Sequence, residues 1–189
     1  MKTDMREAVH LAKQLTGQVT PLKRDCGRVC GARCCSSLEG EETGMLLFPG
    51  EEALYRHREG WQLKKTRDGW LVICPGVCDR EERPLACRLF PLLPLPETAE
   101  GAETAMPAGE AEQVHVTVDE RARGVCPLVK NGIQGLDLAF RQAVRQAGEV
   151  LLQEKEQRAF LLRLKEEQRE LRELRREWGA DVYAGAGEP

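Results

Sequence analysis

Eight cysteines, gathered mainly in two blocks, are the feature that most limits how this 189-residue chain can fold. The first block places four cysteines within ten residues, the second places three within fourteen, and one cysteine stands alone downstream. In chain order they are Cys26, Cys30, Cys34, Cys35, Cys74, Cys78, Cys87 and Cys126. Packing alone rarely concentrates thiols in this way, so the pattern predicts that they bind a metal together.

The cellular compartment decides whether such thiols form disulfides or hold metal. The N-terminal residues 1–18 alternate charged and apolar side chains and lack the apolar core of a secretory signal, so we expect a cytoplasmic protein. Cytosolic thiols are kept reduced, which disfavours a disulfide framework. No apolar run approaches the ~20 residues of a membrane helix. A net charge of -3 gives no basic footprint for nucleic acid. We therefore expect neither a membrane nor a nucleic-acid partner.

The apolar spacing predicts an α+β, mainly helical fold. Residues 1–135 are interpreted as a small cysteine-cluster domain with short strands, including an acidic mobile loop at 97–112. Residues 136–178 contain no proline and one glycine, and predict a long C-terminal helix that packs on the domain and extends from it. A bend is expected at Gly148. The remaining residues, 179–189, are expected to be a disordered tail.

Shorter elements are expected inside the cysteine domain. Helices are predicted at residues 5–15, 51–58 and 84–90, where apolar spacing or proline start signals occur. Strands are predicted at 45–48 and 114–118, and a hairpin at 61–73 turns at Asp68-Gly69.

The spacing of the cysteines leaves the number and kind of metal sites open. Eight thiols are enough for two four-cysteine sites, or for one site plus structural or reactive extras. Isolated Cys126 has the alternative role of a small buried apolar residue. Zinc and iron–sulfur clusters both accept four thiolates. The chain has C-x3-C intervals and an adjacent pair, Cys34-Cys35, but no CxxC knuckle, which favours an iron–sulfur cluster, of the 4Fe-4S type, over zinc.

A resemblance to a known family rests on two segments. CGRVCGARCC, followed by CDREERPLACRLFPL, resembles the CxxCxxCC cysteine-cluster family of YkgJ-like proteins, which are described as zinc- or iron-chelating. RPLACRLFP at residues 83–91 matches the RPxxCRxFP signature of that family residue by residue. The first block departs from the pattern, because both of its intervals hold three residues where the family has two. The resemblance spans roughly residues 26–126.

The resemblance implies metal chelation without an assigned reaction. A related flagellin lysine N-methylase carries a similar cluster, so an enzyme acting on a protein or peptide is one alternative. No glycine-rich nucleotide fingerprint and no catalytic constellation accompany it. Arg83 and Arg88, which flank Cys87, are expected to lie beside the ligands and offset their negative charge. Their alternative role is pairing with Glu81 or Glu82.

The leading hypothesis is therefore a metal-binding protein with a redox or electron-transfer role if the metal is iron. A zinc-stapled interaction module is the other alternative, with a protein partner or a homodimer held by the C-terminal helix. Leu164, Leu171 and Trp178 have the heptad spacing that such a helix would need. Among the histidines, which are expected to be ordinary surface or core residues, His57 is the candidate substitute ligand.

Overall fold

The computed structural model describes residues 4–35, 44–76, 78–97 and 113–179. It has the α+β, mainly helical architecture that the sequence predicts, with two small antiparallel sheets. None of the helices in these ranges combines the length and apolar character that crossing a bilayer requires. The helices and strands are α1 (Met5–Leu15), α2 (Gly27–Cys30), β1 (Met45–Leu46), β2 (Gln62–Lys65), β3 (Trp70–Ile73), α3 (Leu85–Leu89), β4 (Leu92–Pro96), β5 (Val114–Val118), α4 (Leu138–Leu152) and α5 (Lys155–Trp178).

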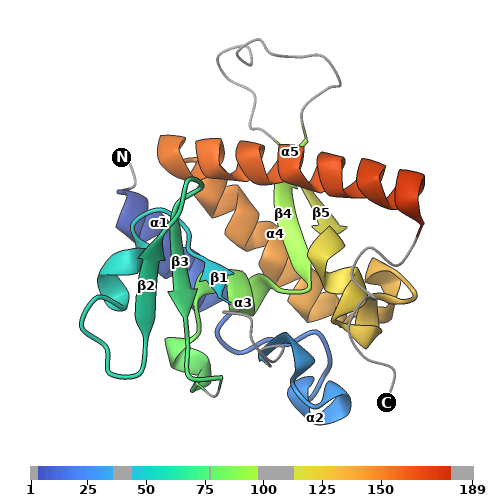
Figure 1. Ribbon diagram of the computed structural model, residues 1–189, viewed down its shortest axis with the longest axis horizontal. Coiled ribbons are helices and arrows are strands. Elements are labelled where there is room, and N and C mark those ends of the chain that lie inside the picture. Colours follow the sequence, from blue (N-terminus) through green and yellow to red (C-terminus); the bar gives the residue numbers. More distant parts are fainter. Residues whose placement is uncertain (1–3, 36–43, 77, 98–112, 180–189) are drawn as a thin grey trace.

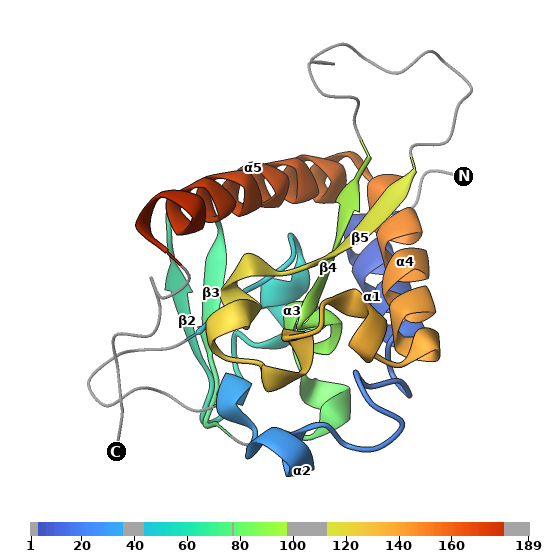
Figure 2. The same cartoon turned by 90° about the vertical axis from the view of Figure 1, so that its right-hand side faces the viewer.

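The two sheets and the long helices form a layered body. One sheet has the strand order β1-β3-β2, and the other pairs β4 with β5. Helices α1 and α4 pack on each other, α4 covers the β4–β5 sheet, and α5 crosses β4. Figures 1 and 2 show α5 at one end of the molecule and α2 at the opposite end. The cysteine segments therefore lie away from the C-terminal helix.

The main hydrophobic core fills the space between these helices and the β4–β5 sheet. On α1 the inward positions follow a helical period, with Ala8 and Ala12 fully buried. The rings of Phe48 and Phe160 meet at 4.9 Å between centroids and join α5 to this core. Burial of such a continuous apolar surface is the main stabilising term for a domain of this size.

Strand β4 was not expected, because it contains Pro94 and Pro96. Both prolines can belong to a strand because neighbouring residues of a strand direct their N–H groups to opposite sides. The Glu97 N–H donates to the Gln113 carbonyl at 2.8 Å, so the nitrogens of Pro94 and Pro96 face away from β5. The missing donors lie on the edge of β4 that pairs with no strand, where proline is tolerated.

The C-terminal segment is two helices rather than one. Helix α4 continues through Gly148 and ends at Leu152, and α5 starts anew at Lys155. The carboxylate of Glu154 accepts the N–H groups of Glu156 and Gln157, which caps the second helix. Gly148 instead permits close packing: a Cβ there would lie 2.5 Å from the Cβ of Pro94.

Side-chain contacts hold α5 against the domain along most of its length. The buried carboxylate of Glu120 contacts Arg123, Arg172 and Arg175, and the Glu120 N–H donates to Gln168 at 2.6 Å. Beyond Arg175 the helix is exposed, and the Trp178 side chain is 73% exposed. The expected packing of the helix on the domain is thus present.

Two other local expectations are partly met. Instead of the helix predicted at residues 51–58, a single 3₁₀ turn, η2 (Glu51–Leu54), is followed by a turn. The strand predicted at 45–48 is limited to Met45–Leu46. The acidic loop at 97–112 and the tail at 179–189 lie almost wholly outside the described residues.

Candidate metal centre

The first cysteine block is shaped by a reversal of the chain. Cys26 precedes α2 and Cys30 ends it, so their side chains are one helical turn apart. Gly31 and Ala32 follow with positive φ values of 64° and 53°. Two successive left-handed residues turn the backbone sharply, and the 3₁₀ turn η1 (Arg33–Cys35) then carries the last two cysteines of the block.

The second block starts where the three-stranded sheet ends. Strand β3 finishes at Ile73, so Cys74 leaves the sheet edge directly, and Cys78 follows after a turn at Gly76 with a φ of 82°. Helix α3 then presents Cys87, which is half-buried. Distant segments of the chain thus place their cysteines at one end of the molecule.

A buried ion pair fixes the start of α3. Glu51 is 1% exposed, and its carboxylate accepts the first N–H of α3, from Leu85, at 2.8 Å. Lys13 of α1 donates to the same oxygen at 3.1 Å and to the Tyr55 hydroxyl at 3.2 Å. Burial raises the pKa of Glu51 and lowers that of Lys13, while their attraction opposes both shifts.

Arg88 serves the architecture of the site. Its guanidinium donates to the backbone carbonyls of Lys13 at 2.8 Å, Glu81 at 2.7 Å and Arg83 at 3.2 Å. It therefore ties α3, and with it Cys87, to the end of α1. The expected pairing with a carboxylate is replaced by three carbonyl contacts, one of them to the backbone rather than the side chain of Glu81.

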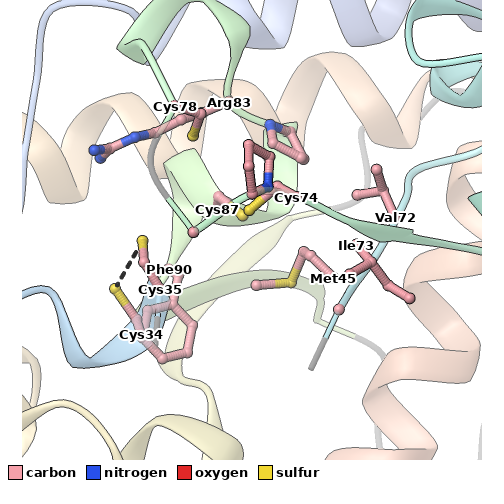
Figure 3. A pocket seen from close by; sticks show the side chains of 14 residues that line it. Cys34, Cys35, Met45, Val72, Ile73, Cys74, Cys78, Arg83, Cys87 and Phe90 are labelled. Carbon is pink, nitrogen blue, oxygen red and sulfur yellow. Dashed lines mark hydrogen bonds between the residues drawn. The ribbon is translucent and has the colours of Figure 1, made fainter. Parts of the chain in front are cut away.

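Within the described residues, a cysteine-lined cavity of about 370 Å³ lies between the two blocks. Its walls combine five cysteines with apolar side chains from β1, β3 and the end of α3. Figure 3 shows Cys34 and Cys35 entering from the first block, and the other three cysteines coming from the second. The five cysteines are Cys34, Cys35, Cys74, Cys78 and Cys87.

A smaller cavity has a volume of about 40 Å³ and lies beside α2. It too is lined by five cysteines, together with Arg80, Arg83 and Arg88. Two of the five, Cys34 and Cys87, line both cavities. The complete set is Cys26, Cys30, Cys34, Cys87 and Cys126. All eight sequence-predicted ligands therefore line one of two adjoining cavities, including Cys126, which is also buried.

Electrostatic coupling between the thiols is strongest at the adjacent pair. The sulfurs of Cys34 and Cys35 lie 4.0 Å apart and share a hydrogen bond. This bond lowers the pKa of Cys35 to about 6 and raises that of Cys34. Elsewhere burial is the largest influence, and it raises the pKa of Cys26, Cys78 and Cys126. Without a metal, most of these thiols hold their protons at neutral pH.

Arg83 is the cation that lies between the two cavities and lines both. Burial lowers its pKa, but negative charge at Cys78 and Cys35 outweighs burial and raises it. Within the described residues, its buried Nε atom has no hydrogen-bond partner. An N–H donor of this kind beside thiolates can stabilise their negative charge.

Arg80 was missed by the sequence reasoning. It lines the smaller cavity, and its guanidinium donates to the carbonyls of Gly17 at 2.6 Å and Thr16 at 3.2 Å. Its position two residues after Cys78 was the available signal. His57, the candidate substitute ligand, lines neither cavity.

The donor set of both cavities suits a thiophilic metal, since thiolates are preferred by zinc and iron–sulfur clusters. Within the ranges described, however, no group of three or more His, Cys, Asp or Glu side chains is arranged so that it could hold a metal ion directly. The thiols line cavities rather than a closed ligand shell. Comparison with known proteins gives no match to a family model, a curated protein or a solved structure.

Proposed function

We propose that this is a cytoplasmic metalloprotein that holds an iron–sulfur cluster in the larger cavity and uses it for electron transfer or redox sensing. The observation that carries the proposal is the gathering of cysteines from η1, the end of β3 and α3 around one cavity. These segments are far apart in the sequence, and their approach is more specific than clustering along the chain. The resemblance of RPLACRLFP to the YkgJ-like family supports the same function.

The size of the cavity favours a cluster over a single zinc ion. Zinc is bound by four sulfurs at about 2.3 Å, a shell that leaves almost no free space. The cavity has about 370 Å³, against about 30 Å³ for one water molecule in the liquid. A group of several iron and sulfide atoms uses such space, and its four protein ligands are thiolates.

The surroundings suit a redox centre. Arg83 provides positive charge and an N–H donor beside Cys35 and Cys78, and hydrogen bonds to sulfur tune the potential of a cluster. Cys34 is exposed, which places one edge of the cavity within reach of a partner at the surface. The reduced cytosol keeps these thiols available for metal.

The deciding experiment is anaerobic purification followed by measurement of iron, acid-labile sulfide, zinc and visible absorption. About four iron and four sulfide atoms per chain and a broad visible band are expected for one 4Fe-4S cluster. Cys78→Ser should remove these four iron and four sulfide atoms. Met45→Leu is the matched control, because Met45 lines the same cavity and the change conserves volume. Protein that lacks both bound metal and sulfide after reconstitution would refute the proposal, and zinc without sulfide would replace the cluster by a zinc site.

A further inference from the structure

We propose that the eight cysteines form two separate four-thiol centres, one at each cavity, which meet at the Cys34-Cys35 pair. This inference rests on the proposed function, because it assumes that the thiols bind metal. Its new content is the second centre, a site for a thiophilic ion or cluster in the smaller cavity, and the assignment of every cysteine to one of the two. The first centre uses Cys35, Cys74, Cys78 and Cys87, and the second uses Cys26, Cys30, Cys34 and Cys126.

The two cavities carry the assignment for six of the eight cysteines. Cys26, Cys30 and Cys126 line only the smaller cavity. The cysteines that line only the larger one are Cys35, Cys74 and Cys78. Each cavity thus has three thiols of its own, one short of the four that zinc and cubane clusters take from proteins.

The two cysteines that line both cavities complete the sets. Among the thiols, Cys35, Cys74 and Cys78 of the larger cavity have the strongest electrostatic influence on Cys87. Besides its direct contact with Cys35, Cys34 is close enough to Cys26 and Cys30 for their negative charge to raise its pKa. We therefore assign Cys87 to the larger cavity and Cys34 to the smaller.

The same division of ligands between two centres occurs in a known class of iron–sulfur proteins. In bacterial two-cluster ferredoxins, three cysteines of a run bind one cluster and the fourth, which precedes a proline, binds the other. Here the first three cysteines of the block share the smaller cavity, and the fourth, Cys35, turns to the larger one. The remote ligand of the smaller cavity, Cys126, is followed by Pro127. Adjacent Cys34 and Cys35 can serve different centres because Cys34 also lines the smaller cavity, whereas Cys35 lines only the larger one.

The test uses the wild-type protein and follows its thiols while metal is removed. Anaerobically purified protein is titrated with a chelator in the presence of iodoacetamide, and mass spectrometry identifies the alkylated cysteines at each step. The cysteines should become reactive as two groups of four, with the membership given above. Reaction of all eight in one step, or of groups with different members, would overturn the inference.

Variants give an independent measurement. Cys30→Ser and Cys126→Ser should remove only the metal of the smaller centre, whereas Cys74→Ser and Cys78→Ser should remove only that of the larger centre. The losses of iron, sulfide and zinc in the two sets should add up to the wild-type content, and the element lost shows whether the second centre is an ion or a cluster. A circular dichroism spectrum checks that each variant is folded.

The outcomes separate this inference from the proposed function. If wild-type protein contains one cluster that survives Cys126→Ser with full occupancy, the second centre is refuted and the proposed function stands. If every folded variant loses all metal, a single shared centre replaces the two. If the wild-type protein binds no metal, both proposals fail.

Discussion

The helical layer and the cysteine region of this protein are held together by different means. The layer, made of α1, α4, α5 and the β4–β5 sheet, contributes most of the buried side chains of the main hydrophobic core. The cysteine region has short turns instead: α2 has four residues, none of them buried, and η1 has three. Isolated helices of this length are unstable in water. The comparison teaches that the layer folds by burying apolar surface, whereas the cysteine region needs another source of order.

Removal of the proposed metal is the largest expected effect and the sharpest test of this contrast. Structural zinc sites contribute on the order of 10 kcal/mol to folding, so the metal-free protein should lose the order of its cysteine region. Hydrogen exchange should show lost protection at residues 26–35, 74–76 and 78–82 and retained protection in α4, β5 and α3, whose Leu85 and Leu89 are buried in the main core. Equal protection of both regions with and without metal would break the comparison.

Phe140→Ala should have the opposite pattern. Phe140 is fully buried in the core between α4 and its neighbours, and its truncation should cost about 3–5 kcal/mol. Denaturant unfolding measures the loss, and the metal content of the folded variant should be unchanged. Leu138→Ala, two residues away and 58% exposed, is the control and should cost less than about 0.5 kcal/mol. A drop in metal content as large as the drop in stability would show that the regions are not independent.

Glu51→Gln addresses the junction between the two regions. The substitution leaves the Lys13 ammonium, only 12% exposed, without its counter-charge, and breaking such a buried pair costs about 3–5 kcal/mol. Because Glu51 also holds the first N–H of α3, the variant should bind metal more weakly. Calorimetry and metal analysis check the two effects, with Glu59→Gln at an exposed position as the control. Unchanged metal affinity would show that the position of Cys87 does not depend on this pair.

The smallest expected effect is a dependence on alkaline pH. Burial raises the pKa of Tyr55 above its ordinary value of 10.0, and the charges of Glu51 and Cys87 add to the shift. Above about pH 10 the unfolded state loses the Tyr55 proton, whereas the folded state keeps it. The contribution of Tyr55 to the free energy of unfolding is therefore complete below about pH 10 and declines at higher pH. Tyr55→Phe should cost about 1 kcal/mol at pH 8 and less at pH 11, measured by denaturant unfolding. A difference that stays constant across this range would contradict the assignment.

Sequence reasoning succeeded where local patterns determine the structure. The helix at 5–15, the hairpin at 61–73, the helix after Pro84 and the strand at 114–118 all appear, because spacing, caps and turns act within a few residues. It did not predict β4, because a strand that contains two prolines needs an edge without a pairing partner, and that edge is a property of the sheet. The break between α4 and α5 depends on a Glu154 cap that a strongly helical composition concealed.

The same limit applies to the site. The sequence identified all eight cysteines, Arg83 and Arg88 as candidates, and all of them line at least one of the two cavities. Spacing could not divide them between cavities, because the division depends on the reversal at Gly31 and Ala32 and on the approach of segments that are distant in sequence. The architectural role of Arg88 depends on the end of α1, which is 75 residues away along the chain.

The prolines of β4 also affect how this protein meets copies of itself. An open strand edge with regularly spaced N–H donors invites another strand to add to it, which is a common route to aggregation. At Pro94 and Pro96 the edge of β4 that faces away from β5 carries no donor, and the Pro96 carbonyl on that edge already accepts a hydrogen bond from the Lys165 ammonium of α5 at 2.9 Å. All five residues of β4 are also buried, so the sheet offers no place on that side for a strand from a second copy.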